Sequence, residues 1–159
     1  MPDVRSGDGR RRPPSEFKQL TFGDSRQALC ALGCLNSSLC YWFITVFSDC
    51  RHVNKREVDA FPVDLGRLAQ GQQGATLAET ANRLMTDMKS NSERRKLSFA
   101  HDDLTVQCIF PKLSKSVIDE IDQVLAKHYG FTDEELDFII NYDIKYRMGR
   151  GAGDSDAEG

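Results

Sequence analysis

The sequence lacks a large excess of charge of either sign. Its formal net charge is −3 at pH 7, which excludes a protein held on nucleic acid by bulk charge alone. A hydrophobic content of 40% also excludes wholesale disorder and collagen-like or coiled-coil classes. Basic residues outnumber acidic ones in residues 83–115, and the reverse holds in residues 116–159. Any nucleic-acid surface is therefore expected to be local.

Paired cysteines and a secretory leader are also absent. The five cysteines are an odd number, and Cys40 and Cys50 do not complete a metal-ligand set with Cys30 and Cys34. No His supplies a matched ligand, so buried core thiols are a simpler interpretation than a zinc site. Residues 1–12 are polar and contain no apolar signal run. We therefore expect reduced thiols in a cytoplasmic protein.

Motifs for catalysis are missing as well. The closest approach to a Gly-rich phosphate loop, residues 147–151, is followed by a tail and not by a helix. No pattern brings a His next to a Cys, as a nucleophilic pair requires. The acidic residues between 119 and 137 fall on polar faces or first turns of predicted helices, where negative charge offsets the helix dipole. We interpret these carboxylates as structural.

A run of 22 uncharged residues, 27–48, is long enough to span a bilayer. Its polar and small residues, Gln27, Gly33 and residues 36–38, favour two core helices instead, with a bend at Asn36-Ser37. The prediction is therefore a helix over 25–35 and a second over 37–48. A small membrane protein stays open as a minor alternative.

The next elements are predicted from caps and periodicity. Asn54 and Glu57 form a capping box for a short helix that ends before Pro62. A helical stripe follows over residues 77–88, and period-two alternation in residues 97–110 predicts a β-hairpin. Residues 117–142 then predict two helices, separated at Gly130.

The predicted fold is α+β, mostly helical, with one small β-hairpin. The expected organisation has a disordered leader, a helical segment, a loop, a helix–hairpin–helices segment and a disordered tail. These parts span residues 1–16, 17–65, 66–74, 75–148 and 149–159.

The most suggestive polar cluster follows an aromatic run at 41–47 and consists of Arg51, His52, Asn54, Lys55 and Arg56. Arg and Lys neutralise phosphates, and Asn and Arg also read base edges. An ordinary capped helix with a solvated basic start explains the same residues. Arg94-Arg95-Lys96 forms a second basic patch, which a solvated strand end also explains.

Two long strings resemble a known family. The first runs from residue 35, as LNSSLCYWF, through DCRHVNKRE at 49–57 to Phe61-Pro62, and the second covers residues 118–149. Both resemble the C-terminal end of large adenine-specific DNA methyltransferases of bacterial restriction–modification and phage-defence systems. The resemblance covers about residues 16–150 and includes no catalytic motif.

The resemblance implies a target-recognition fragment that contacts double-stranded DNA. In such enzymes a separate N-terminal domain binds S-adenosylmethionine, and an Asn-Pro-Pro-aromatic motif holds the flipped adenine. This sequence has neither, so the resemblance implies no catalytic residue and no cofactor in this chain. The residues that it places near DNA are Ser37, Ser38, Arg51, His52, Asn54, Lys55 and Arg56.

A recognition fragment without its methylase domain is expected to expose apolar surface, with the face of residues 28–47 as the candidate. The missing domain, or a separate methylase subunit, would cover that surface. A non-enzymatic protein-interaction remnant that docks on such a chain is therefore the main alternative to DNA recognition.

Overall fold

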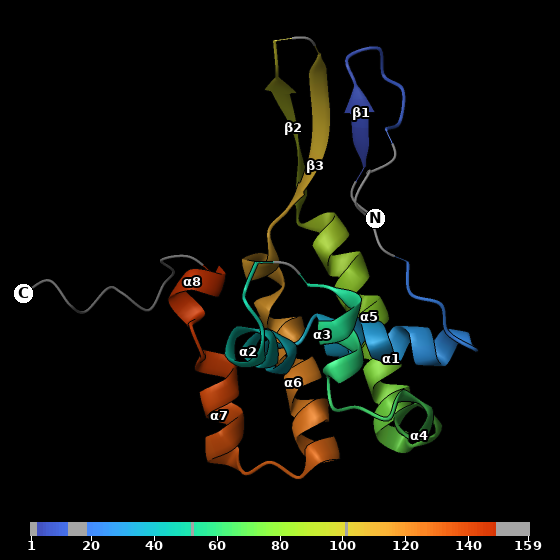
Figure 1. Cartoon of the computed structure of the whole chain (residues 1–159), viewed down its shortest axis with the longest axis vertical. Helices are drawn as coiled ribbons and strands as arrows, with labels where there is room; N and C mark the ends of the chain where they lie inside the picture. Colours follow the sequence, from blue (N-terminus) through green and yellow to red (C-terminus); the bar gives the residue numbers. More distant parts are fainter. Residues whose placement is uncertain (1–2, 13–18, 52, 101, 149–159) are drawn as a thin grey trace, which may run out of the picture.

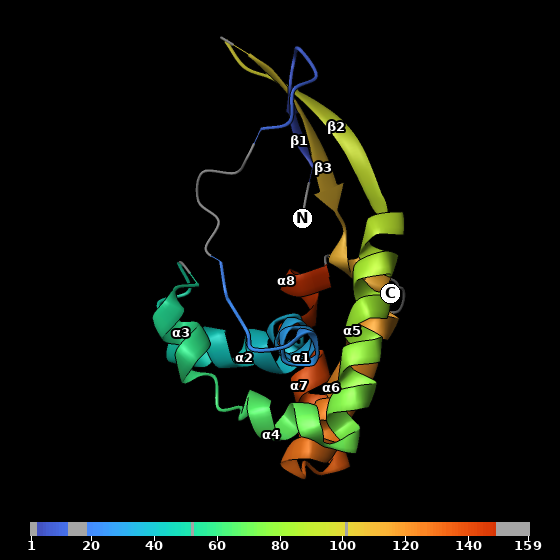
Figure 2. The same cartoon turned by 90° about the vertical axis from the view of Figure 1, so that its right-hand side faces the viewer.

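The longest helix, α5 (Gln72–Ser90), leads from the strands into the helical body of the computed structural model (Figure 1). The structure describes residues 3–12, 19–51, 53–100 and 102–148. Leu77, Ala81 and Leu84 on α5 are fully buried, because these apolar residues recur at helical spacing. On this stripe α5 packs against α1 (Ser25–Leu35), α4 (Leu65–Gln70) and α6 (Lys115–Tyr129), as Figure 2 shows from the side.

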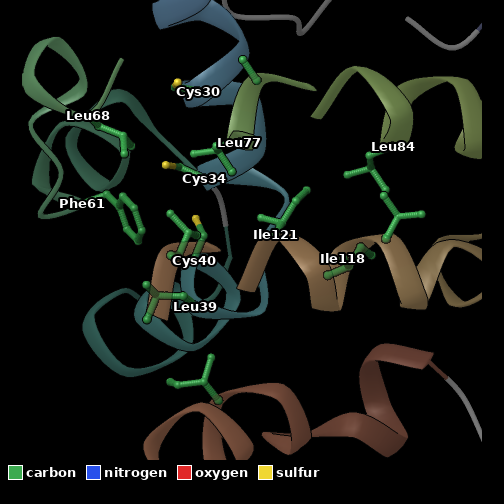
Figure 3. Close-up of a cluster of buried hydrophobic side chains, with 14 of the residues drawn as sticks. Cys30, Cys34, Leu39, Cys40, Phe61, Leu68, Leu77, Leu84, Ile118 and Ile121 are labelled. Atoms are coloured by element: carbon green, nitrogen blue, oxygen red, sulfur yellow. The ribbon is translucent and has the colours of Figure 1, made fainter. Parts of the chain in front are cut away.

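The core lies where these helices meet α2 (Ser38–Phe47) (Figure 3). Its side chains come from segments far apart in the sequence, which ties the body together. The labelled members in the close-up are Cys30, Cys34, Leu39, Cys40, Phe61, Leu68, Leu77, Leu84, Ile118 and Ile121.

The two predicted helices at the start of the body are confirmed. Helices α1 and α2 are bent by 64° at the break between them, and Ser37 is the N-cap of α2, accepting a hydrogen bond from the Cys40 N–H at 3.0 Å. No single helix among the described residues is long and apolar enough to cross a membrane. Helices α1 and α2 meet that test only as a bent pair.

The short helix α3 (Lys55–Ala60) is also confirmed, with Asn54 as its N-cap and a complete capping box with Glu57. It ends at Phe61, which is extended at φ −62° and ψ 122°, as the following Pro62 requires. The Phe61 ring is buried and meets Phe43 of α2 edge-on at 5.4 Å between centroids. This contact fixes the end of α3 against the body.

The predicted loop at 66–74 is wrong, because α4 and the first turn of α5 occupy it. Asp64 caps α4 by accepting a hydrogen bond from the Arg67 N–H at 2.9 Å, and Leu68 and Ala69 are buried. The Gln and Gly residues suggested a linker, but two buried apolar residues are enough to hold one helical turn against α5. Gly74 allows that close approach.

The predicted hairpin is confirmed and belongs to a three-stranded antiparallel sheet. Strand β2 (Ser92–Ser98) pairs with β3 (Asp103–Ile109), which also pairs with β1 (Val4–Ser6) in the order β1-β3-β2. Strand β1 overturns the prediction of a disordered leader for residues 3–12. Val4 lies opposite Val106, and the Asp3 carboxylate forms ion pairs with Arg5 and Arg94.

The C-terminal part contains one helix more than predicted. A 3-10 turn η1 (Pro111–Ser114) leads into α6, which ends at Gly130 with φ 73°, a left-handed conformation suited to glycine. Helix α7 (Asp133–Asn141) has the predicted Thr132–Glu135 capping box, and α8 (Ile144–Met148) follows. The predicted tail, 149–159, lies outside the described residues. The fold class is α+β and mostly helical, as predicted.

A substitution at Gly74 tests the α4–α5 contact. A Cβ atom there would overlap the Leu68 carbonyl and lie 2.8 Å from the Ala69 Cα, and backbone atoms cannot move aside as a side chain can. We expect Gly74→Ala to lower the free energy of unfolding by about 2–3 kcal/mol, measured by urea denaturation. In the control Gly66→Ala, the nearest atom is 3.4 Å away. Equal stability of the two variants would contradict this packing.

Candidate nucleic-acid interface

A tight turn after α2 brings the basic segment to the surface. Cys50 has φ 56°, which is uncommon for a residue with a side chain, and its N–H donates to the Ser48 hydroxyl at 3.1 Å. The Arg51 N–H donates to an Asp49 carboxylate oxygen, also at 3.1 Å. The chain bends here, and Arg51 is exposed.

Glu57 of the α3 capping box binds two of the residues that were predicted to contact DNA, Asn54 and Arg56. A Glu57 carboxylate oxygen accepts from the Asn54 N–H at 2.9 Å, and the other oxygen accepts from the Arg56 guanidinium at 2.8 and 3.1 Å. Hydrogen bonds from its own backbone N–H and from Arg56 lower the pKa of Glu57. The Asn54 N–H therefore binds a carboxylate in the free protein, and the Arg56 side chain stays 81% exposed.

The other cations of this segment differ in how they are held. The Lys55 ammonium pairs with Asp59 one turn along α3, and both side chains are more than half exposed. For Arg51 no side-chain partner occurs within the part of the chain that the structure describes. His52 lies outside the described residues. Arg51 is thus the cation of this segment best placed to receive an external anion.

An open groove joins three of the predicted residues to the helical body. It has a volume of about 1120 Å³ and lies between residues 19–22, the C-terminal end of α1, and α3. Arg51, Asn54 and Lys55 contribute polar groups to its lining, and the remaining residues are mostly apolar. Arg56 does not line this groove. The structure therefore brings Arg51, Asn54 and Lys55 together and leaves Arg56 on a neighbouring surface.

Ser37 and Ser38 are not part of this surface. They are buried, with exposed fractions of 4% and 0%, so the expectation that they lie near DNA is corrected. Their oxygen atoms serve the α1–α2 bend: the Ser37 hydroxyl donates to the Cys34 carbonyl at 2.6 Å and accepts from the Cys40 N–H. Asn and Ser before a helix indicate a cap, and this local signal explains Ser37, whereas Ser38 binds partners that are distant in sequence.

A carboxylate from α6 completes the cap of α2. One oxygen of the buried Asp122 accepts from the Ser38 N–H at 2.9 Å and from the Leu39 N–H at 3.4 Å, while its second oxygen has no partner among the described atoms. The Arg147 guanidinium donates to the Ser38 hydroxyl and lies over the Tyr41 ring at 5.0 Å. Helices α2, α6 and α8 therefore meet at one buried polar cluster.

The second predicted basic patch is largely neutralised within the sheet. Arg94 pairs with Asp3, Arg95 with Glu93, and Lys96 with Asp103. These are exposed ion pairs on an edge strand, where charged side chains also discourage pairing with another chain. The geometry supports a solvated strand for this patch.

Three of the five cysteines are core thiols, whereas Cys50 is exposed and Cys108 is half-buried. Cys30, Cys34 and Cys40 are buried, and burial raises the pKa of Cys34 to about 12 and that of Cys40 to about 11. Among the described residues, no group of three or more His, Cys, Asp or Glu side chains is arranged to hold a metal ion. The thiols of Cys34 and Cys40 are protonated at neutral pH and contribute packing.

Comparisons with protein-family models, with curated proteins and with solved structures give no match to this chain. The resemblance to adenine-specific methyltransferases therefore depends on the two sequence strings alone.

The environment of Asp122 predicts a specific pH dependence. Burial raises its pKa from 3.8 to about 6, against the lowering effect of hydrogen bonds from Ser38 and Leu39 and of the Arg147 charge. The folded chain thus holds this proton more tightly than the unfolded chain, so the stability that it contributes is full below about pH 4 and is lost as pH rises through about 6.

We expect the stability of the wild type to fall by up to about 3 kcal/mol relative to Asp122→Asn between pH 4 and pH 7. The Asn side chain keeps an oxygen acceptor for the α2 amides but does not titrate. Urea unfolding of both proteins across this range measures the difference. Parallel stability curves would contradict the assignment of a buried, titrating carboxyl group.

Proposed function

We propose that this chain is the target-recognition fragment of a site-specific adenine DNA methyltransferase, and that its basic segment contacts double-stranded DNA. The basic segment comprises Arg51, Asn54, Lys55 and Arg56, and His52 belongs to it by sequence. The observation that carries the proposal is the exposure of all three of its Arg and Lys side chains within six residues, beside an open groove.

Ion pairs within the segment are weak competitors for phosphate. Lys55 pairs with Asp59, and an exposed pair of this kind is worth only about 0.2–1 kcal/mol. Arg56 pairs with the buried Glu57, but its own side chain is 81% exposed. A DNA phosphate offers a similar charge, and its binding also releases counterions. Arg51 has no described intramolecular partner to give up. The segment therefore suits backbone positioning, with Arg51 as the side chain able to read base edges.

In this proposal, methyl-donor binding and catalysis belong to a separate methylase domain or subunit. The methyl donor S-adenosylmethionine and the Asn-Pro-Pro motif belong to the parent enzyme, on a methylase domain or subunit, so this chain alone is proposed to bind DNA without modifying it. The sheet is antiparallel and has three strands, unlike the parallel sheet of a nucleotide-binding domain. A cytoplasmic location stays a prediction.

A protein-interaction remnant or split subunit is the alternative function. It is favoured by the exposed apolar end of α2, where Val46 and Phe47 are 48% and 65% exposed. Most of the face of residues 28–47 does not contribute, because Cys30, Cys34 and Leu39 are buried. A methylase chain would cover the remaining exposed patch.

A charge-matched pair of variants tests the DNA contact. We expect wild-type binding to a duplex to weaken steeply with salt, and Arg51→Ala/Lys55→Ala/Arg56→Ala to reduce the slope of log K against log salt by up to about 3. The reason is that each lost phosphate contact releases about one counterion fewer. Fluorescence anisotropy of a labelled duplex at several salt concentrations measures the slope.

The control variant is Arg67→Ala/Lys89→Ala/Lys127→Ala, which removes three exposed cations from other helices. Its net charge equals that of the test variant, so bulk electrostatics are matched. An equal loss of slope in both variants, or no loss in the first, would count against the proposed surface.

Transfer of a labelled methyl group to DNA by the pure chain would contradict the proposal that this chain alone binds DNA without modifying it. Absence of salt-sensitive binding would favour the interaction alternative.

A further inference from the structure

The pair formed by Arg56 and Glu57 joins an exposed cation to a buried carboxylate. The Glu57 side chain is 6% exposed, whereas that of Arg56 is 81% exposed. The Nε and Nη2 groups of Arg56 both donate to one carboxylate oxygen, Oε1, at 3.1 and 2.8 Å. The other oxygen of Glu57, Oε2, accepts from the Asn54 N–H at 2.9 Å. The helix cap therefore fixes the carboxylate, and the guanidinium extends from it toward solvent.

A second pair in the chain forms the same fork without a buried carboxylate. The Nε and Nη2 groups of Arg95 donate to Oε2 of Glu93 at 3.3 and 3.1 Å. Both side chains are more than half exposed there, and Glu93 lies on strand β2, where it caps no helix. Such a pair must restrict two long side chains at once. In the pair at α3 only Arg56 has freedom left to lose, because burial and the cap already restrict Glu57.

The guanidinium of Arg56 keeps one edge available for a ligand. Its Nε and one hydrogen of Nη2 point to Glu57, so Nη1 and the second hydrogen of Nη2 point away from the carboxylate. Two parallel N–H donors on a planar edge match O6 and N7 of guanine in the major groove, the commonest specific contact of arginine with DNA. A guanidinium that is already held loses less side-chain freedom when it makes this contact.

The charge of Glu57 favours a base over a phosphate as the ligand of Arg56. Hydrogen bonds from its own backbone N–H and from Arg56 lower the pKa of Glu57, so this carboxylate is ionised at neutral pH. A phosphate that approached Arg56 would also approach this negative charge, which would repel it. A guanine edge is neutral and presents two acceptor atoms. Lys55, whose partner Asp59 is exposed, suits a phosphate better.

We propose that Glu57 is a positioning residue that holds Arg56 to read a guanine in the major groove of the duplex. This inference rests on the proposed function, because it names the side chain of the basic segment that gives a sequence preference. Lys55 then contributes affinity through the DNA backbone. Arg51, which has no comparable support, remains able to contact a phosphate or a base.

Glu57→Gln separates the positioning role from the helix cap. Glutamine serves in a capping box as glutamate does, so its single side-chain oxygen can still accept from the Asn54 N–H. Its NH2 group then faces Arg56, and two donors cannot bind each other. Glu93→Gln is the matched control, because it makes the same change of charge and opens the same fork on β2. Both variants should keep the wild-type circular dichroism spectrum.

Binding to a selected duplex and to its single-pair variants tests the role of Glu57. The wild type first selects duplexes from a random-sequence library, and sequencing identifies the preferred site. We expect replacement of one G·C pair in this site by A·T to weaken wild-type binding roughly tenfold, measured by fluorescence anisotropy. In Arg56→Ala and in Glu57→Gln this ratio should fall below about threefold, whereas Glu93→Gln should keep the wild-type ratio.

The outcomes distinguish this inference from the proposed function. A wild type that binds duplexes without a preference for guanine would overturn the role of Glu57 and leave the DNA contact standing. A Glu57→Gln variant that keeps the full ratio, or a Glu93→Gln variant that loses it, would do the same. A wild type that binds no duplex at all would overturn both.

Discussion

The hydrogen bonds from the α2 N-terminus to the Asp122 carboxylate are the interaction on which the arrangement of this molecule depends. A 64° bend between two apolar helices leaves backbone N–H groups without helical partners inside the core. Ser37 satisfies one of them from the local chain, and Asp122 satisfies two more from α6. Arg147 then holds the Ser38 hydroxyl from α8. A single polar cluster thus fixes how three helices meet.

This cluster also determines where the basic segment lies. The direction of α2 is set at its N-terminus by Asp122 and at its C-terminal half by the contact of Phe43 with Phe61. The turn at Cys50 and the start of α3 lie between Phe43 and Phe61 along the chain. The segment with the exposed cations is therefore anchored to the core on both sides, as the proposed contacts with the DNA backbone require.

Local signals in the sequence predicted most of the elements. Caps at Ser37, Asn54 and Thr132, and the left-handed stop at Gly130, each depend on residues within four positions of one another, so one stretch of sequence contains the whole signal. The errors involve partners that are distant in sequence. Strand β1 forms because Val4 pairs with Val106 of β3. Residues 66–74 are mostly helical because Leu68 and Ala69 are buried in the core.

In the candidate site, too, features with a local sequence signal were predictable and features with distant partners were not. Exposure of Arg51, Lys55 and Arg56 was predictable from a capped helix that begins after a turn. The contacts of the buried Ser38 were not, because Asp122 is 84 residues from it in the sequence. The sequence places Asp122 among several structural carboxylates on polar faces or first turns of helices, and no local pattern separates a carboxylate that caps another helix from one that offsets the dipole of its own.

Nuclear magnetic resonance of the isotope-labelled chain, titrated with a DNA duplex, tests the central claim most directly. The account predicts amide shifts concentrated at Arg51, Asn54, Lys55 and Arg56, with the buried amides of Ser38 and Leu39 unchanged. Shifts centred on β2 or on α7 instead, or a spectrum that the duplex leaves unaltered, would contradict it.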